Sequence, residues 1–409
     1  MSLDPGTRLE RFADLVVQVG ANVQPGSDIM LRSDIAHIEI ARAVVERAYA
    51  AGAAWVEIVW SDGPIRHSQL THASIERLAQ PRAWAIERTR AWAAGRGVSI
   101  ALTGDPDPHL LDDVDPAKAA ALPLEEAIAF RQALMGGQLR WTVVAAPNPG
   151  WAREVFGEPD VERLWDAVAT AMRLDDPDPA QSWRDRAAEL AERARALDAL
   201  ELTEVRYRGS GTDLTVGLVP GTRWTGGSMD DPNGLTYMPN IPTEEVFASP
   251  DRRRAEGVIS LTKPVIIAGQ VVEGLQATLA DGRITNVTAA TGVEAVRAQL
   301  ETDEGARSLG EVALVDRASR IAKAGILFHD TLFDENAGCH VAWGQSFPFS
   351  VADGLAKGAD ELFEIGLNRS AVHTDVVIGG EGMTVTASGP KGSVDIIRDD
   401  EWVLSSAAR

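Results

Sequence analysis

Short apolar runs alternate with longer amphipathic stretches over the first half of the chain. Apolar residues spaced three and four apart are typical of helices, and short runs between turn residues are typical of buried strands. Since each strand-to-helix step takes about 25–45 residues, enough for a crossover, we expect a largely parallel sheet with right-handed connections. The predicted strands cover residues 27–34, 54–60, 97–104 and 139–147, and the predicted helices cover residues 36–51, 81–95, 116–135, 161–172 and 181–200.

The pattern changes after Leu200, where glycine, threonine and valine become frequent. Two alternating runs flank Gly209-Ser210-Gly211, which predicts a β-hairpin over residues 201–218. Short strands then continue, with a few helices predicted over residues 291–302, 318–324 and 350–356. We therefore expect an α/β fold of two domains. The N-terminal domain, residues 1–200, is a largely parallel α/β domain, and the C-terminal domain, residues 201–409, is a mostly antiparallel α+β domain that carries the chemistry.

Composition narrows the classes of partner. The 409 residues carry a formal net charge of −21, which argues against binding to nucleic acid or to an anionic membrane surface. The sequence has no apolar run long enough to span a bilayer and no apolar segment typical of a secretory signal. Cys339 is the single cysteine, so no intrachain disulfide can form, and we expect a cytoplasmic protein.

Carboxylates and histidines gather in four segments between residues 240 and 380. Such a mixture suits Zn, Co or Mn, and three or more carboxylates can hold two metal ions when one carboxylate bridges them. This set predicts a metal site in the C-terminal domain. The candidate residues are Glu244, Glu245, Glu311, His340, His373 and Asp375.

Each candidate also has a simpler interpretation. His373 and Asp375 lie two residues apart in an apolar run, so a strand would place both on one face, where they could form a structural hydrogen bond instead. His340 could be a core histidine near a helix start, and Glu311 could be an edge residue of a strand. Glu244 and Glu245 resemble the first turn of a helix, where carboxylates interact favourably with the helix dipole.

Other catalytic patterns are missing from the sequence. It contains no GxSxG nucleophile elbow, no GxxxxGK[ST] phosphate loop, and no HExxH or CxxC motif. Cys339 beside His340 could be a thiol nucleophile, but a small buried residue next to a metal ligand is the preferred interpretation.

Five motifs, in order, resemble the aminopeptidase T and aminopeptidase S family of thermophilic metalloproteases. They are PNIPTEEVFASPD, KPVIIAGQVVEGL, GEVALVD, DENAGCHVAWG and HTDVVIGG. The resemblance implies a two-domain homodimer that removes N-terminal residues from small peptides with a water activated by two divalent ions (Zn, Co or Mn). It implies that the dimer encloses a cavity into which the metal sites face. It places the metal ligands at Glu245, Glu311, His340, His373 and Asp375, with Glu311 as the bridging carboxylate, and Glu244 is our candidate for the proton carrier.

One position departs from the family pattern. Members often have a tyrosine seven residues after the first ligand histidine, whereas this chain has Phe347. A phenol there can contact metal or stabilise the tetrahedral intermediate, which phenylalanine cannot do, so the departure bears on activity more than on metal binding. The nearby hydroxyl of Ser346 could substitute weakly.

Two alternatives remain open from the sequence. Two histidines and Asp375 also suit a mononuclear Fe(II) ring-cleaving dioxygenase built on the same scaffold. The chain could instead be a metal-stabilised dimer with weak or lost catalysis, for which Phe347 is the sequence support. Metal stoichiometry distinguishes the first alternative, and turnover of an aminoacyl substrate excludes the second.

Overall fold

The computed structural model describes residues 3–405 apart from residues 96, 120, 122, 136 and 138. Contacts divide the described chain into two compact units: unit 1 lies within Met1–Arg186 and Ser228–Pro242, and unit 2 within Ala187–Gly227 and Thr243–Arg409. The domain boundary near residue 200 stays a prediction, because contact density alone does not identify an independently folding domain.

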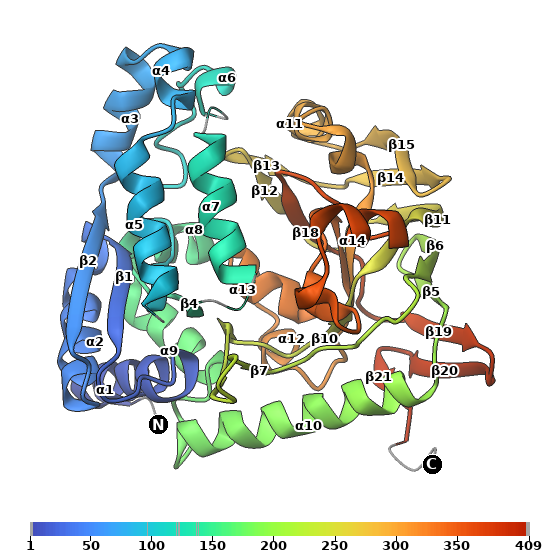
Figure 1. The fold of residues 1–409 in the computed structure, drawn as a ribbon, viewed down its shortest axis with the longest axis horizontal. Coiled ribbons are helices and arrows are strands. Elements are labelled where there is room, and N and C mark those ends of the chain that lie inside the picture. Colours follow the sequence, from blue (N-terminus) through green and yellow to red (C-terminus); the bar gives the residue numbers. More distant parts are fainter. Residues whose placement is uncertain are drawn as a thin grey trace. The chain divides into compact units, whose positions relative to one another are not determined.

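Unit 1 is built on a parallel sheet. The first two strands of this sheet are drawn in blue in Figure 1. Val98, Ile100 and Leu102 of its third strand are buried, as expected for a strand covered on both faces. The sheet order is β2 (Trp55–Ser61), β1 (Asp28–Asp34), β3 (Val98–Thr103), β4 (Arg140–Ala145) and β9 (Asn240–Ile241). A short ladder joins β7 (Met229–Asp230) to β8 (Thr236–Tyr237).

Several helices of unit 1 begin at residues whose side chains cap free backbone N–H groups. Asp4 accepts from the backbone N–H of Thr7 at the start of α1, and Asn148 accepts from that of Trp151 at the start of α8. The helices are α1 (Pro5–Leu15), α2 (Ile38–Ala50), α3 (Gly63–His72), α4 (Ile75–Ala79), α5 (Ala83–Ala94), α6 (Pro116–Ala119), α7 (Leu124–Met135), α8 (Pro149–Phe156) and α9 (Val161–Ala171). Helix α10 (Pro179–Ala199) continues from unit 1 into unit 2.

The single helix predicted over residues 116–135 is wrong in its continuity, because α6 ends at Ala119 and α7 begins at Leu124. Pro123 lacks a backbone N–H, so it begins a helix more easily than it continues one. Residues 120 and 122 of that prediction lie outside the described residues.

Unit 2 contains a large antiparallel sheet and a small one. The predicted hairpin is present, since β5 (Glu204–Gly209) and β6 (Thr212–Leu218) pair around Ser210. The large sheet has the order β15 (Arg283–Thr288), β14 (Gln276–Ala280), β11 (Pro250–Ser260), β6 (Thr212–Leu218), β5 (Glu204–Gly209), β19 (Thr384–Gly389), β20 (Gly392–Arg398) and β21 (Glu401–Trp402). The small sheet has the order β10 (Val246–Ala248), β16 (Leu309–Leu314), β17 (His340–Gly344) and β18 (His373–Val377), and β12 (Val265–Ile267) pairs separately with β13 (Gln270–Val272).

Helices are short in unit 2. The helix predicted over residues 350–356 is replaced by 3-10 turns at Pro348–Ser350 and Gly354–Ala356. The short helices are α11 (Val293–Leu300), α12 (Arg320–Ala324), α13 (Thr331–Asp334) and α14 (Ala359–Ile365).

Two local interpretations at the candidate site are wrong. The segment from His340 onward is strand β17 rather than the start of a helix, and Glu244 and Glu245 precede strand β10 rather than opening a helix. In both places burial in a sheet outweighs the local helix-start signal, because β-branched and aromatic residues follow.

The predicted fold class is confirmed: a parallel α/β part is followed by a mostly antiparallel α+β part. Within the described residues, no helix combines the length and apolar character needed to cross a membrane.

Candidate metal centre

The small sheet of unit 2 has one apolar face and one polar face. Val312, Val341 and Val376, from three adjacent strands, belong to the hydrophobic core of the unit. Successive side chains of a strand point to opposite faces, so the intervening residues point away from that core. In the register, Glu311 lies opposite Ala342, which lies opposite Asp375. Residues directly opposite one another share a face, so two carboxylates flank a small alanine there.

A β-bulge sets the position of Glu311. The pairing shifts between Leu309 and Glu311, which leaves Gly310 as an extra residue on β16. A Cβ atom at Gly310 would lie 2.4 Å from the backbone oxygen of Gln345, so only glycine allows this close approach. The local sequence therefore bends the strand immediately before the central carboxylate.

Both histidines are oriented by backbone carbonyls. The Nδ1–H of His340 donates to the carbonyl of Gly338 at 3.3 Å, and the Nδ1–H of His373 donates to that of Gln345 at 2.8 Å. Each imidazole therefore presents its Nε2 atom to the carboxylates. Fixing one ring nitrogen on a carbonyl is the usual way in which proteins prepare the other as a metal ligand.

The carboxylates and imidazoles form two groups that share Glu311. Glu245, Glu311 and His340 place ligand atoms within 4.8 Å of one another, and so do Glu311, His373 and Asp375. The two oxygens of Glu311 face different histidines: Oε1 lies 3.9 Å from Nε2 of His340, and Oε2 lies 3.3 Å from Nε2 of His373. The outer carboxylates complete the groups, with Glu245 Oε2 at 2.9 Å from His340 Nε2 and Asp375 Oδ1 at 3.4 Å from His373 Nε2.

Burial differs between the two groups. Glu245, Glu311 and His340 are at most 5% exposed, whereas His373 and Asp375 are half-buried. Reactants in solution can therefore reach the group of His373 and Asp375 more easily than the group of His340.

The pKa values of these groups are shifted because carboxylates lie close together in a buried environment. Burial, together with the charges of Glu245 and Asp375, raises the pKa of Glu311 to about 7, although His373 acts to lower it. Burial opposes the charged form of His340, but Glu245 outweighs it and raises the pKa of His340 to about 9. Burial likewise opposes the charged form of His373, and Asp375 and Glu311 raise the pKa of His373 well above its usual value. Burial also disfavours the charged form of Asp375, yet the attraction of His373 lowers the pKa of Asp375.

The donor set fits divalent metal ions. Buried carboxylates that lie this close together are costly unless positive charge neutralises them. Among the described residues, protonated His340 and His373 supply positive charge to these carboxylates, through the same Nε2 atoms that would bind a metal. Carboxylate oxygens and imidazole nitrogens are the donors that Zn, Co and Mn take in proteins.

The structure brings together Glu245, Glu311, His340, His373 and Asp375, all five residues expected to be ligands. Glu244, the sixth candidate, is fully buried, and its backbone N–H donates to the side chain of Asn336 at 2.6 Å. The assignment of metal ligands and of Glu244 stays a prediction.

Glu335 was missed by the sequence analysis. It is 9% exposed and lines a small cavity of about 30 Å³ together with Asp375 and His329. Burial, followed by the charges of Asp375, Glu245 and Glu311, raises the pKa of Glu335 well above its usual value. Its place in DENAG, five residues before His340, could have marked it.

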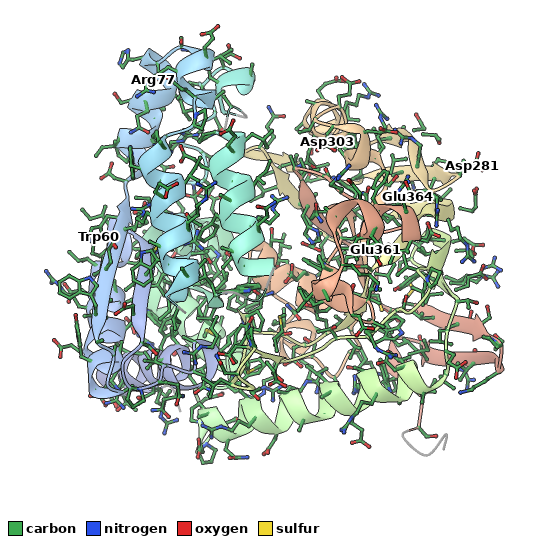
Figure 2. All side chains as sticks on the ribbon, in the orientation of Figure 1. Trp60, Arg77, Asp281, Asp303, Glu361 and Glu364 are labelled. Atoms are coloured by element: carbon green, nitrogen blue, oxygen red, sulfur yellow. The ribbon has the colours of Figure 1, made fainter. Side chains whose placement is uncertain are left out.

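The loop before β18 is anchored by Asp303, labelled in Figure 2. The side chain of Asp303 accepts from the backbone N–H of Ala371 at 2.6 Å and from the hydroxyl of Ser370 at 2.8 Å. This anchor fixes the start of the strand that carries His373 and Asp375.

Cys339 is a buried structural residue. It is 0% exposed, its thiol donates to the carbonyl of Val315, and burial raises the pKa of the thiol to about 12. A thiol that stays protonated is a poor nucleophile, so the geometry agrees with the preferred interpretation from sequence.

A buried carboxylate–histidine centre on one face of a sheet is typical of metal-dependent enzymes, and comparison with known proteins identifies the family. The family model described as thermophilic metalloprotease (M29) matches residues 6–402. The chain belongs to this family of metal-dependent hydrolases, as the sequence motifs predicted.

Curated relatives match over nearly their whole length. Aminopeptidase PepS of Streptococcus thermophilus is 36% identical over 97% of this chain and 98% of its own. Aminopeptidase T of Thermus thermophilus is 37% identical with the same coverage. The solved structure of wild-type AmpT from Thermus thermophilus has a TM-score of 0.88 at 34% identity, covering 98% of this chain and all of that one.

A more distant likeness concerns the fold alone. The structure of 2,5-dihydroxypyridine dioxygenase from Pseudomonas putida covers both chains fully with a TM-score of 0.55, but at 12% identity. The two chains share an architecture, and the whole-chain family match favours the metalloprotease class over the dioxygenase alternative.

Proposed function

We propose that this protein is an aminopeptidase that removes the N-terminal residue of small peptides with the help of two divalent metal ions. The observation that carries the two-ion proposal is Glu311, whose two carboxylate oxygens face two different histidines. A carboxylate in that position could be shared by two ions, as in two-metal aminopeptidases. The curated relatives named aminopeptidases support the choice of reaction.

In this proposal Glu245 and His340 would hold one ion, His373 and Asp375 would hold the other, and Glu311 would be shared by both groups. When bound, such ions polarise a peptide carbonyl and make water acidic enough to act as a nucleophile near neutral pH. The two imidazoles then act as neutral ligands, with their Nδ1–H groups on backbone carbonyls. The buried position of Glu245 and Glu311 keeps bulk water from competing with their interactions.

Hydrolysis of a peptide bond also requires a proton to move from water to the leaving amine. Glu244 was predicted for this role from sequence and stays a candidate. Glu335 is a second candidate, because its carboxyl group shares a small cavity with Asp375 and interacts electrostatically with Glu245, Glu311 and Asp375. That cavity is large enough for a water molecule.

Exopeptidase action requires recognition of the free α-amine of the substrate. The site is rich in carboxylates, and a cluster of carboxylates attracts an ammonium group. Blocking the amine should therefore abolish cleavage.

The test compares leucyl-p-nitroanilide with its N-acetylated form, using protein loaded with Zn, Co or Mn. We expect release of p-nitroaniline from the free-amine substrate and none from the acetylated one. Cleavage of both substrates would contradict an aminopeptidase, and cleavage of neither with any metal would contradict a peptidase of this class. One bound iron per chain with ring-cleaving activity would instead support the dioxygenase alternative.

A further inference from the structure

Three phenylalanines gather beside the candidate metal centre. Phe247 follows Glu245 by two residues, on the polar face of the small sheet, and Phe347 and Phe349 lie in the segment after β17. All three are half-buried, and neither hydrophobic core cluster of unit 2 includes them. Large aromatic side chains left partly exposed beside a polar centre are typical of a ligand pocket.

The rings form one continuous apolar group that reaches a ligand histidine. Phe347 stacks on Phe349 with ring centroids 5.1 Å apart, and Phe247 meets the two edge-on at 5.6 and 6.2 Å. The ring of Phe347 lies 5.0 Å from the imidazole of His373. The group therefore begins at the more exposed half of the metal centre.

Two serines hold the aromatic segment in place. The backbone N–H of Phe347 donates to the hydroxyl of Ser249 at 3.0 Å, the hydroxyl of Ser350 donates to the carbonyl of Phe347 at 2.7 Å, and the two serine hydroxyl oxygens lie 2.6 Å apart. Ser249 lies two residues after Phe247, so these hydrogen bonds tie the segment that carries Phe347 and Phe349 to the segment that carries Phe247. Rings held in this way lose little side-chain freedom when a ligand arrives.

We infer that Phe247, Phe347 and Phe349 form the subsite for the apolar side chain of the substrate's N-terminal residue. The inference rests on the proposed function and deepens it. The α-amine and the first carbonyl of the peptide lie at the carboxylates and histidines, and the first side chain packs against the rings. The enzyme then prefers leucyl and phenylalanyl substrates over alanyl, glycyl and charged ones, because only large apolar side chains bury surface there.

The test measures kcat/KM for leucyl- and alanyl-p-nitroanilide in the metal-loaded wild-type protein and in Phe349→Ala. We expect the leucyl value to fall about tenfold while the alanyl value stays within about twofold, because the lost ring contacts only the larger side chain. Phe349→Leu, which keeps an apolar wall, should retain most of the preference. Metal content and the unfolding temperature of each variant show whether it is folded and loaded.

Phe363→Ala is the matched control, because Phe363 is also half-buried in unit 2 but packs against Arg252 and Arg369. Its ratio of leucyl to alanyl kcat/KM should equal that of the wild type. An unchanged ratio in Phe349→Ala, or a wild-type preference for alanyl or lysyl substrates, would overturn the subsite while leaving the proposed function intact. Absence of hydrolysis of every aminoacyl substrate by the wild type would overturn the proposed function itself.

Discussion

At the scale of single residues, the candidate centre depends on which carboxyl groups carry protons. Glu335 and Glu311 are carboxylic acids whose pKa values burial raises, in the same region as histidines whose neighbours favour their charged forms. Environments that favour the neutral form of one titratable group and the charged form of its neighbour are frequent at catalytic sites. The chain's own groups are thus prepared both to bind cations and to exchange protons.

The proton carrier can be identified by removing its charge alone. We predict that Glu335→Gln lowers kcat by about a hundredfold with full metal content, because an amide cannot accept the proton of water. Glu244→Gln should lower kcat less than tenfold if Glu335 is the carrier, by the same reasoning. Steady-state kinetics with metal analysis check this. The reverse order of the two losses would return the role to Glu244.

Metal binding should depend on pH in one direction. Protons compete with metal for Glu311, whose pKa is about 7, for His340, whose pKa is about 9, and for His373, whose pKa is raised well above its usual value. Affinity should therefore rise with pH to at least about pH 9, and binding at pH 7 should release more than one proton per chain. Calorimetry in two buffers of different ionisation enthalpy measures this release. Binding with no proton release would contradict the assigned ligands.

At the scale of elements, alternate side chains of the small sheet point to opposite faces, one packed on the hydrophobic core and one carrying the candidate metal ligands. Val341 and Trp343 face the hydrophobic core, and His340 and Ala342 face the candidate centre. Ala342 lies between Glu311 and Asp375 in the register, so a larger side chain at this position would take up room that ions need.

Enlarging Ala342 should close that room. We predict that Ala342→Val lowers the bound metal below one ion per chain and abolishes hydrolysis, while the chain stays folded. Val341→Ile is the control on the opposite face, because it also overpacks a fully buried position, at a cost of about 1–3 kcal/mol. Metal analysis and circular dichroism decide the result. Two ions per chain in Ala342→Val would show that the alanine does not border the site.

The sequence predicted the elements whose patterns were long and regular, such as the parallel strands and the hairpin around Ser210. It misjudged His340, because ENAG resembles a helix start, and only pairing with β16 and β18 makes the next residues a strand. The same limit explains Glu335. Glu335 opens the 3-10 turn Glu335–Ala337, which contacts strand β18 from a distant part of the sequence, and a local pattern does not contain such a contact.

At the scale of the whole molecule, the candidate centre lies entirely within unit 2. Matches over nearly the full chain show that both units are part of the family's architecture. The homodimer and the cavity it would enclose stay predictions from the resemblance, and the cytoplasmic location stays a prediction from the single cysteine.

Metal removal should destabilise unit 2. Ions that bind only the folded chain stabilise it by about 2.7 kcal/mol at a free concentration one hundred times the Kd. We predict that chelation lowers the unfolding temperature and that Zn, Co or Mn restores it. Differential scanning calorimetry measures the shift, and His373→Ala should show a smaller one. Equal unfolding temperatures with and without saturating metal would show that no ion binds the folded state.

The most direct test of the account is a metal titration of the stripped protein with leucyl-p-nitroanilide hydrolysis followed in the same preparation. The account predicts that activity rises to a plateau near two divalent ions per chain, and that His373→Ala reaches neither the plateau nor the second ion. Full metal content and full activity in His373→Ala, or activity without bound metal in the wild type, would contradict it.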